Sequence, residues 1–168
     1  LLADHIAETF GTDNLTVVSP DSGRVRVADI WADRLGTPLA IVHKRRDPDK
    51  PNQVEVNEIV GDVAGRDCLL VDDMIDTGGT ILAAAKALKA KGAARVIVAA
   101  THAVFSTPAV ERLSDEVIDS VVVTNTLPVT PDKEFKTLTV LSIAPLIAKA
   151  IAAVFYDDSV NSLFPGHS

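Results

Sequence analysis

The densest group of chemically useful side chains lies between Asp72 and Thr80. These nine positions hold three carboxylates, two threonines and two glycines, between an apolar run at 68–71 and an Ala- and Leu-rich stretch at 80–91. The two flanking segments are typical of a strand followed by a helix. The start of a helix presents unpaired N–H groups and a partial positive charge, and glycine lets a phosphate approach the backbone closely. We expect a phosphate to bind at the turn formed by Asp76, Thr77, Gly78, Gly79 and Thr80.

A carboxylate pair, Asp72 and Asp73, precedes this turn. Placed at the end of a strand, such a pair can accept hydrogen bonds from the vicinal hydroxyls of a sugar, which predicts a site for a phosphorylated ribose. The alternative is that Asp76 and Thr77 cap the helix while the pair is solvated. Capping accounts for one Asp or Thr but not for the whole group. The nucleotide-binding patterns G-x-x-x-x-G-K-[ST] and G-x-G-x-x-G are absent.

A basic triplet, Lys44-Arg45-Arg46, opens a polar segment at 43–52 that contains two prolines and shows no periodicity. We expect a mobile loop at the carboxyl edge of the sheet, where these cations could clamp a phosphoryl group during transfer. The alternative, a solvated run of surface charge, stays open.

Asp21 lies in an acidic turn, Ser19-Pro20-Asp21-Ser22-Gly23, directly after the apolar run at 15–19. One carboxylate can help to hold Mg²⁺, because this ion keeps several of its waters. The alternative is that Asp21 caps the helix expected to begin at Val25, and this is the better explanation when the turn is considered alone. The four histidines lack metal-ligand spacing, and Cys68 is predicted to be inert within a buried strand.

The composition limits the class of protein. The chain has 168 residues, of which 47% are apolar and 23% charged, which suits a single domain spanning 1–168. One cysteine excludes a disulfide framework. A net charge of −7 argues against binding to nucleic acids or anionic membranes, and no apolar run approaches the roughly 20 residues that span a bilayer. We expect a cytoplasmic protein that binds neither nucleic acid nor membrane.

Apolar runs alternate with helical periodicity along the chain. Strands are expected at 15–19, 39–42, 54–60, 68–71, 96–100, 120–123 and 138–141, helices at 2–10, 25–35, 80–91, 108–113 and 144–154, and an extended tail at 160–164. Fully apolar strands separated by helices predict an α/β fold, a doubly wound, mostly parallel sheet with helices on both faces. Ligands bind beyond the carboxyl ends of such strands, where Asp21, Lys44, Asp72 and His102 are expected.

Taken together, the segments resemble the carboxyl-terminal half of the ribose-phosphate pyrophosphokinases, or phosphoribosyl pyrophosphate synthetases. The run VVSPDSG resembles the family's glycine turn, HKRRD its catalytic flexible loop and VDDMIDTGGT its ribose 5-phosphate loop, and THAVFSTPAVERL, VVVTNTLP, LTVLSIAPLIAKAI and SVNSLF match in the same order. The acidic phosphate loop by itself is shared with type I phosphoribosyltransferases, whose fold the resemblance implies.

The resemblance implies transfer of the diphosphoryl group of MgATP to O1 of ribose 5-phosphate, giving phosphoribosyl pyrophosphate and AMP. Lys44 and Arg46 resemble the family's catalytic lysine and the arginine that contacts the reacting phosphates and ribose 5-phosphate. Asp72, with Asp73 as its neighbour, would bind the ribose hydroxyls, and residues 76–80 would hold the 5-phosphate.

The resemblance also implies a cofactor and partners. Asp21 would help to place Mg²⁺, ATP and ribose 5-phosphate would be the ligands, and the protein would form a homo-oligomer, commonly a hexamer. The family's amino-terminal half, which carries the adenine-binding segments, has no counterpart here. We therefore expect a fragment that binds ribose 5-phosphate weakly and turns over little or nothing alone.

One turn departs from the family pattern. Most relatives have a second glycine where this chain has Arg24, and an arginine where it has Val27. Two alternatives to the synthetase stay open. One is a type I phosphoribosyltransferase, which would consume phosphoribosyl pyrophosphate, and the other is a non-catalytic subunit that regulates an active synthetase.

Overall fold

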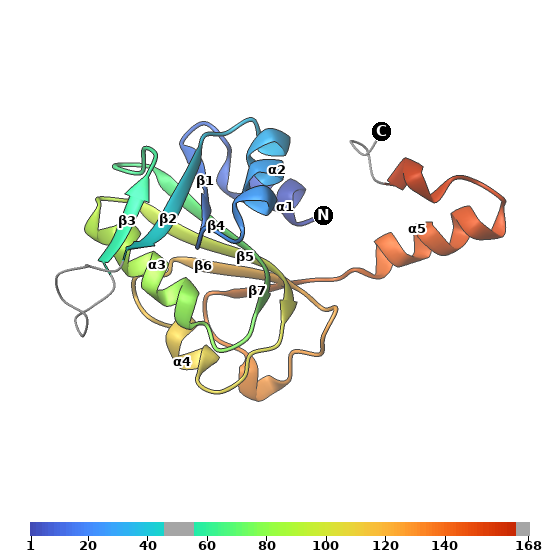
Figure 1. Ribbon diagram of the computed structural model, residues 1–168. Helices are drawn as coiled ribbons and strands as arrows, with labels where there is room; N and C mark the ends of the chain where they lie inside the picture. Colours follow the sequence, from blue (N-terminus) through green and yellow to red (C-terminus); the bar gives the residue numbers. More distant parts are fainter. Residues whose placement is uncertain (46–55, 164–168) are drawn as a thin grey trace.

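A mixed seven-stranded sheet lies at the centre of the molecule (Figure 1), in a computed structural model that describes residues 1–45 and 56–163. The strand order is β3-β2-β1-β4-β5-β6-β7. All neighbours pair in parallel except β3, which runs antiparallel to β2 at one edge. The bounds are β1 Leu15–Ser19, β2 Leu39–Arg45, β3 Val56–Val60, β4 Asp67–Ile75, β5 Arg95–Ala103, β6 Ser120–Thr124 and β7 Leu138–Leu141. The predicted α/β fold with a mostly parallel sheet is confirmed.

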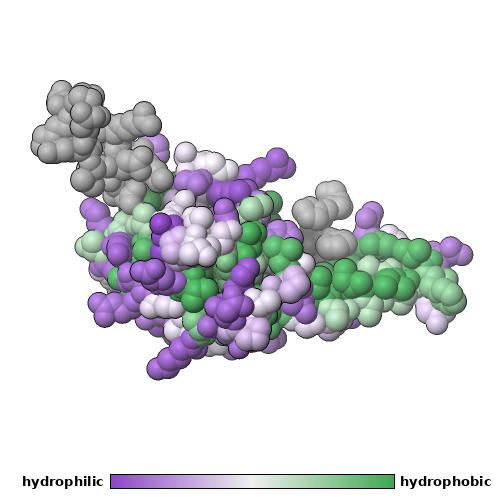
Figure 2. Space-filling view, turned by 90° about the horizontal axis from the view of Figure 1, so that it is seen from below, coloured by the Kyte–Doolittle hydropathy of each residue, from purple (hydrophilic) through white to green (hydrophobic). Residues whose placement is uncertain are grey.

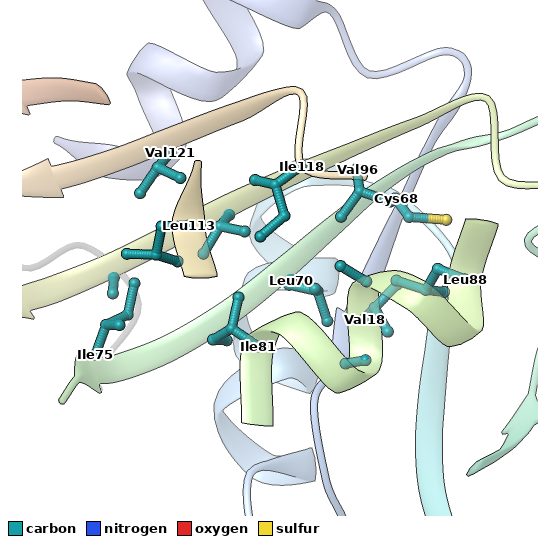
Figure 3. Packing of buried hydrophobic residues seen from close by; sticks show 14 of the residues in the cluster. Val18, Cys68, Leu70, Ile75, Ile81, Leu88, Val96, Leu113, Ile118 and Val121 are labelled. Carbon is teal, nitrogen blue, oxygen red and sulfur yellow. The ribbon is translucent and has the colours of Figure 1, made fainter. Parts of the chain in front are cut away.

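Helices cover both faces of the sheet, which explains why its central strands are apolar over most of their length. They are α1 Leu2–Phe10 and α2 Val25–Leu35 on one face, and α3 Gly79–Ala90 and α4 Ala109–Leu113 on the other. β1 is buried along its whole length, with Val17 packed in the α1/α2 layer and Val18 in the α3/α4 layer. Figure 3 shows the second layer, in which Leu88 of α3 and Leu70 of β4 belong to the same buried cluster.

The direction of winding reverses between β1 and β4. From β1 the chain passes through α2 to β2 on one side, and from β4 it passes through α3 to β5 on the other. The two strands pair in parallel, with Val18 opposite Leu70, so their carboxyl ends lie together. Such a reversal opens a crevice beyond the strand ends, which is where doubly wound sheets bind ligands.

Three elements differ from the sequence-based expectation. The expected loop at 43–52 begins later, because His43 to Arg45 continue β2 and pair with β3. β4 extends through Ile75 because its ladder with β5 continues to that residue, so Asp72 and Asp73 lie within the strand rather than after it. The expected extended tail is wrong over 160–163, where η2 (Val160–Leu163) is a 3₁₀ turn beside α5. Another 3₁₀ turn, η1, spans Pro131–Lys133.

The helix α5 (Ala144–Phe155) stands away from the sheet (Figure 1), and its surface is largely apolar (Figure 2). Ile151 is 64% exposed and Phe155 78% exposed. Together with Val160 they border an apolar groove of about 440 Å³ between α5 and η2. Among the described residues, no helix combines the length and the apolar character that crossing a bilayer requires.

Replacing Leu88 by Ala should lower the free energy of unfolding by about 2–5 kcal/mol, because the side chain is fully buried and a cavity would remain. The matched control, Ile151→Ala, should change it by less than about 0.5 kcal/mol, because that side chain lies mostly in water. Urea denaturation followed by circular dichroism measures both values, and equal losses would contradict the described packing.

Candidate functional site

A cavity of about 160 Å³ lies at the carboxyl end of β4, at the turn into α3. Its walls come from one continuous segment that contains most of the predicted phosphate and sugar residues. The lining residues are Asp72, Met74, Ile75, Asp76, Thr77, Gly78, Gly79, Thr80 and Ile81. The structure therefore brings the predicted turn residues and Asp72 together around one small hollow.

The backbone of this turn leaves donors available at the start of α3. Gly78 has φ +71°, a left-handed conformation that a residue with a side chain rarely adopts. The first hydrogen bond of the helix joins the N–H of Leu82 to the carbonyl of Gly78. The preceding N–H groups have no acceptor within the helix, and Gly78, as N-cap, has no side chain to supply one. Uncapped N–H groups at a helix start favour an anion.

The segment between β5 and α4 supports the turn through hydrogen bonds to its carbonyl groups. The N–H groups of Val104 and Phe105 donate to the carbonyl of Ile75, and that of Ser106 donates to the carbonyl of Asp76. Arg112 of α4 donates from Nη1 to the carbonyl of Thr77 at 3.0 Å. Sequence analysis missed Arg112, because no local pattern tells which backbone carbonyl an arginine from another helix will reach.

The carboxylate pair is held by Arg24, which follows β1. Its Nη2 lies 2.7 Å from Oδ1 of Asp73, its Nη1 donates to Oδ2 of Asp73 at 2.9 Å, and its Nε lies 3.1 Å from Oδ1 of Asp72. The Asp72 side chain is 14% exposed and that of Asp73 is 42% exposed. Asp72 lines the cavity, whereas Asp73 is turned into the ion pair.

The pKa values of the two carboxyl groups are shifted in opposite directions. Burial raises the pKa of Asp72 to about 6, assisted by the hydrogen bond that it shares with Asp73 and opposed by the charge of Arg24. For Asp73, burial also disfavours the charge, but the hydrogen bond from Asp72 and the nearby guanidinium outweigh it and hold the pKa below its usual value. Below about pH 6 the pair therefore retains a proton, which resides on Asp72.

Asp21 forms hydrogen bonds within the turn after β1. Its Oδ1 accepts hydrogen bonds from the N–H groups of Gly23 at 2.8 Å and Arg24 at 3.1 Å, and the Ser19 hydroxyl donates to the Asp21 carbonyl at 2.7 Å. These bonds close a turn ahead of α2 and do not cap the helix, because both donors precede Val25 and the N-cap residue, Arg24, makes no side-chain capping bond. Over residues 1–45 and 56–163, no group of three or more His, Cys, Asp or Glu side chains is arranged to hold a metal ion.

The predicted cationic residues are only partly within the described structure. The backbone of Lys44 lies in β2 opposite Asn57. The Lys44 side chain and the whole of Arg46 lie outside the described part of the chain. His102 lies opposite Met74, and its Nδ1 is 2.8 Å from Oγ1 of Thr126.

Cys68 is fully buried, and burial raises its pKa to about 11. The expectation of an inert core thiol is confirmed.

Comparison with known proteins identifies the family. The family model of the phosphoribosyl synthetase-associated domain matches residues 48–165. The chain is 63% identical over 164 residues to the ribose-phosphate pyrophosphokinase of Streptomyces coelicolor, covering 98% of this chain and 51% of that protein. It is 58% identical over 167 residues to the enzyme of Mycobacterium tuberculosis, covering 99% of this chain and 51% of that protein. The chain thus spans about half the length of the curated relatives it matches.

Solved structures agree with this assignment. The phosphoribosylpyrophosphate synthetase of Mycobacterium smegmatis superposes with a TM-score of 0.84 at 54% identity, covering 93% of this chain and 50% of that one. An adenine phosphoribosyltransferase superposes with a TM-score of 0.56 at 21% identity, covering 73% of this chain and 76% of that one, which shows a shared fold. The chain belongs to the phosphoribosyl synthetase family and corresponds to the carboxyl-terminal half of a ribose-phosphate pyrophosphokinase.

Proposed function

We propose that this chain binds ribose 5-phosphate and presents it to the diphosphoryl group of MgATP, so that phosphoribosyl pyrophosphate and AMP form. The observation that carries the proposal is the cavity at the start of α3, where uncapped N–H groups and a carboxylate line the same hollow. Family membership supports the same conclusion. We also propose that residues 1–168 act as one phosphoribosyltransferase-like domain and that the active protein is a homo-oligomer.

The 5-phosphate would bind at the turn. Residues 76–80 offer backbone N–H groups at the positive end of the α3 dipole, and the hydroxyls of Thr77 and Thr80 add donors. The bracing by the β5–α4 segment keeps these donors in place before the ligand arrives. Such preorganisation reduces the entropy that binding costs.

The ribose hydroxyls would be bound by Asp72, the carboxylate that faces the cavity, with Asp73 as its neighbour. An ionised carboxylate is a strong hydrogen-bond acceptor for vicinal hydroxyls. With the phosphate held by the turn and the hydroxyls held by Asp72, O1 of the sugar would have a fixed position for in-line attack on the β-phosphorus of ATP.

The triphosphate side of the reaction would rely on Lys44, Arg46 and Asp21. The two cations, one of which would also contact ribose 5-phosphate, would neutralise the charge that develops on the transferring group. The Asp21 carboxylate suits Mg²⁺, because its backbone partners involve Oδ1 and a hydrated Mg²⁺ needs few protein oxygens. When bound, this ion would shield the phosphate charges of ATP.

Ribose 5-phosphate binding can be tested on the 168-residue chain by NMR. Addition of ribose 5-phosphate should shift the amide resonances of Thr77, Gly78, Gly79 and Thr80, because the phosphate would accept their hydrogen bonds. The amides of Gly92 and Ala93, beyond the opposite end of α3, serve as the internal control. Unphosphorylated ribose should leave the turn unchanged, and shifts confined to other residues would contradict the proposal.

The binding of ribose 5-phosphate should weaken as the pH falls from 7.5 to 5, because Asp72 takes up a proton near pH 6 and ceases to be a charged acceptor. At pH 7.5, Asp72→Asn should cost about 1.5–3 kcal/mol of binding free energy, the usual contribution of a hydrogen bond to a charged group. Calorimetric titration at several pH values measures both effects.

The ligand phosphate also titrates near pH 6, so the comparison with Asp72→Asn separates the two groups. The wild-type affinity should fall more steeply with decreasing pH than that of the variant. Identical slopes would remove Asp72 from the sugar site.

Lys44 should matter for turnover more than for sugar binding. In the chain joined to the amino-terminal half of the Streptomyces coelicolor relative, Lys44→Ala should lower kcat for ribose 5-phosphate-dependent AMP formation by about 100-fold or more. The KM for ribose 5-phosphate should change little. Lys91→Ala, at the far end of α3, is the control. Equal changes in kcat and KM would make Lys44 a binding residue instead.

A further inference from the structure

Arg24 connects the turn after β1 with strand β4 at the winding reversal. It is the N-cap residue of α2, directly after the β1 turn, and its side chain reaches Asp73 inside β4, 49 residues along the chain. Its backbone N–H donates to Oδ1 of Asp21, so the side chain begins from a fixed backbone position. The contacts therefore form a chain from the β1 turn through Arg24 to the wall of the cavity.

The Arg24 guanidinium makes more contacts with Asp73 than with Asp72. Its two terminal nitrogens lie 2.7 and 2.9 Å from the two oxygens of Asp73. Nη1 donates a hydrogen bond to Oδ2, whereas the shorter contact, from Nη2 to Oδ1, is an ion pair without hydrogen-bond geometry. Only Nε approaches Asp72, at 3.1 Å, on the same Oδ1 that accepts the N–H of Asp73 at 2.8 Å. Both oxygens of Asp73 thus contact Arg24, while Asp72 contacts it through one oxygen and lines the cavity.

We propose that Arg24 is a positioning residue of the sugar subsite: by gripping Asp73 and one oxygen of Asp72, it orients the Asp72 carboxylate toward the ribose hydroxyls. This inference rests on the proposed binding of ribose 5-phosphate. The two carboxylates then have different roles: Asp72 contacts the ligand, and Asp73 is the counter-ion that holds Arg24.

The exposure of the ion pair decides what kind of effect to expect. The Arg24 side chain is 37% exposed and that of Asp73 is 42% exposed, so water screens their attraction and the pair adds little to global stability. Its consequence lies in orientation: without the guanidinium, two adjacent carboxylates repel each other and Asp72 gains alternative rotamers. The loss should therefore appear in ligand affinity and not in the melting temperature.

The test compares Arg24→Gln and Arg24→Lys with the wild-type 168-residue chain. The matched control is Arg34→Gln, which removes another partly exposed arginine of α2 from an ion pair, at 2.9 Å from Asp4 and away from the cavity. Calorimetry measures the Kd for ribose 5-phosphate at pH 7.5, and thermal unfolding checks that each variant folds. The ¹³C resonance of the Asp73 carboxyl, followed with pH, reports the ion pair without ligand.

In Arg24→Gln, the Kd for ribose 5-phosphate should rise about tenfold, as expected when a charge-assisted contact no longer fixes the acceptor. Arg24→Lys should recover at most part of this loss, because a single ammonium nitrogen cannot replace the separate guanidinium nitrogens that contact Asp73 and Asp72. Arg34→Gln should bind like the wild type. The Asp73 carboxyl should titrate at higher pH in Arg24→Gln than in the wild type.

A wild-type Kd in Arg24→Gln would overturn the inference while leaving the proposed function standing. Full recovery in Arg24→Lys would also overturn it, because charge alone would then be sufficient. If the wild-type chain itself fails to bind ribose 5-phosphate, the proposed function fails and this inference fails with it.

Discussion

The parallel pairing of β1 with β4 is the constraint on which the candidate site depends. Four residue pairs, from Leu15 opposite Asp67 to Val18 opposite Leu70, join segments that are about 50 residues apart in the chain. Since both strands run in the same direction, their carboxyl ends open at the same edge of the sheet. The crossovers that leave them go to opposite sides of the sheet order, which is the arrangement that opens a crevice at this edge. The turn that carries Arg24 and the acidic pair within β4 meet there for this reason.

At that edge the backbone and not a side chain supplies the main functional feature. The first N–H groups of a helix are normally hydrogen-bonded by the side chain of the N-cap residue. The N-cap residue of α3 is Gly78, which has no side chain. The turn nevertheless holds its shape, because the β5–α4 segment hydrogen-bonds its carbonyls and Arg112 binds one of them from outside. The carbonyls of the turn are therefore hydrogen-bonded while the first N–H groups of α3 have no capping side chain, an arrangement that favours an anion.

The acidic pair shows how burial and charge are balanced beside this turn. Burial alone would favour neutral carboxyl groups on both residues. The hydrogen bond from Asp72 and the charge of Arg24 lower the pKa of Asp73, while Asp72, the more buried of the two, has a pKa raised to about 6. At neutral pH the cavity is therefore lined by an ionised carboxylate and by backbone donors. This polarity fits a phosphorylated sugar better than it fits either a free sugar or an inorganic anion.

The sequence by itself determined the α/β class, the alternation of strands and helices, and the glycine-containing turn at the start of α3, because apolar periodicity and a glycine-rich helix start are local properties. It placed Asp72 and Asp73 beyond their strand, whereas ladder pairing with β5 carries β4 past them to Ile75. It did not identify the partners of Arg24 and Arg112, since an arginine's partner depends on which distant segment lies beside it. Only the tertiary structure decided that Asp72 faces the cavity and that Asp73 faces a guanidinium, because strand order, and not residue type, determines which groups meet.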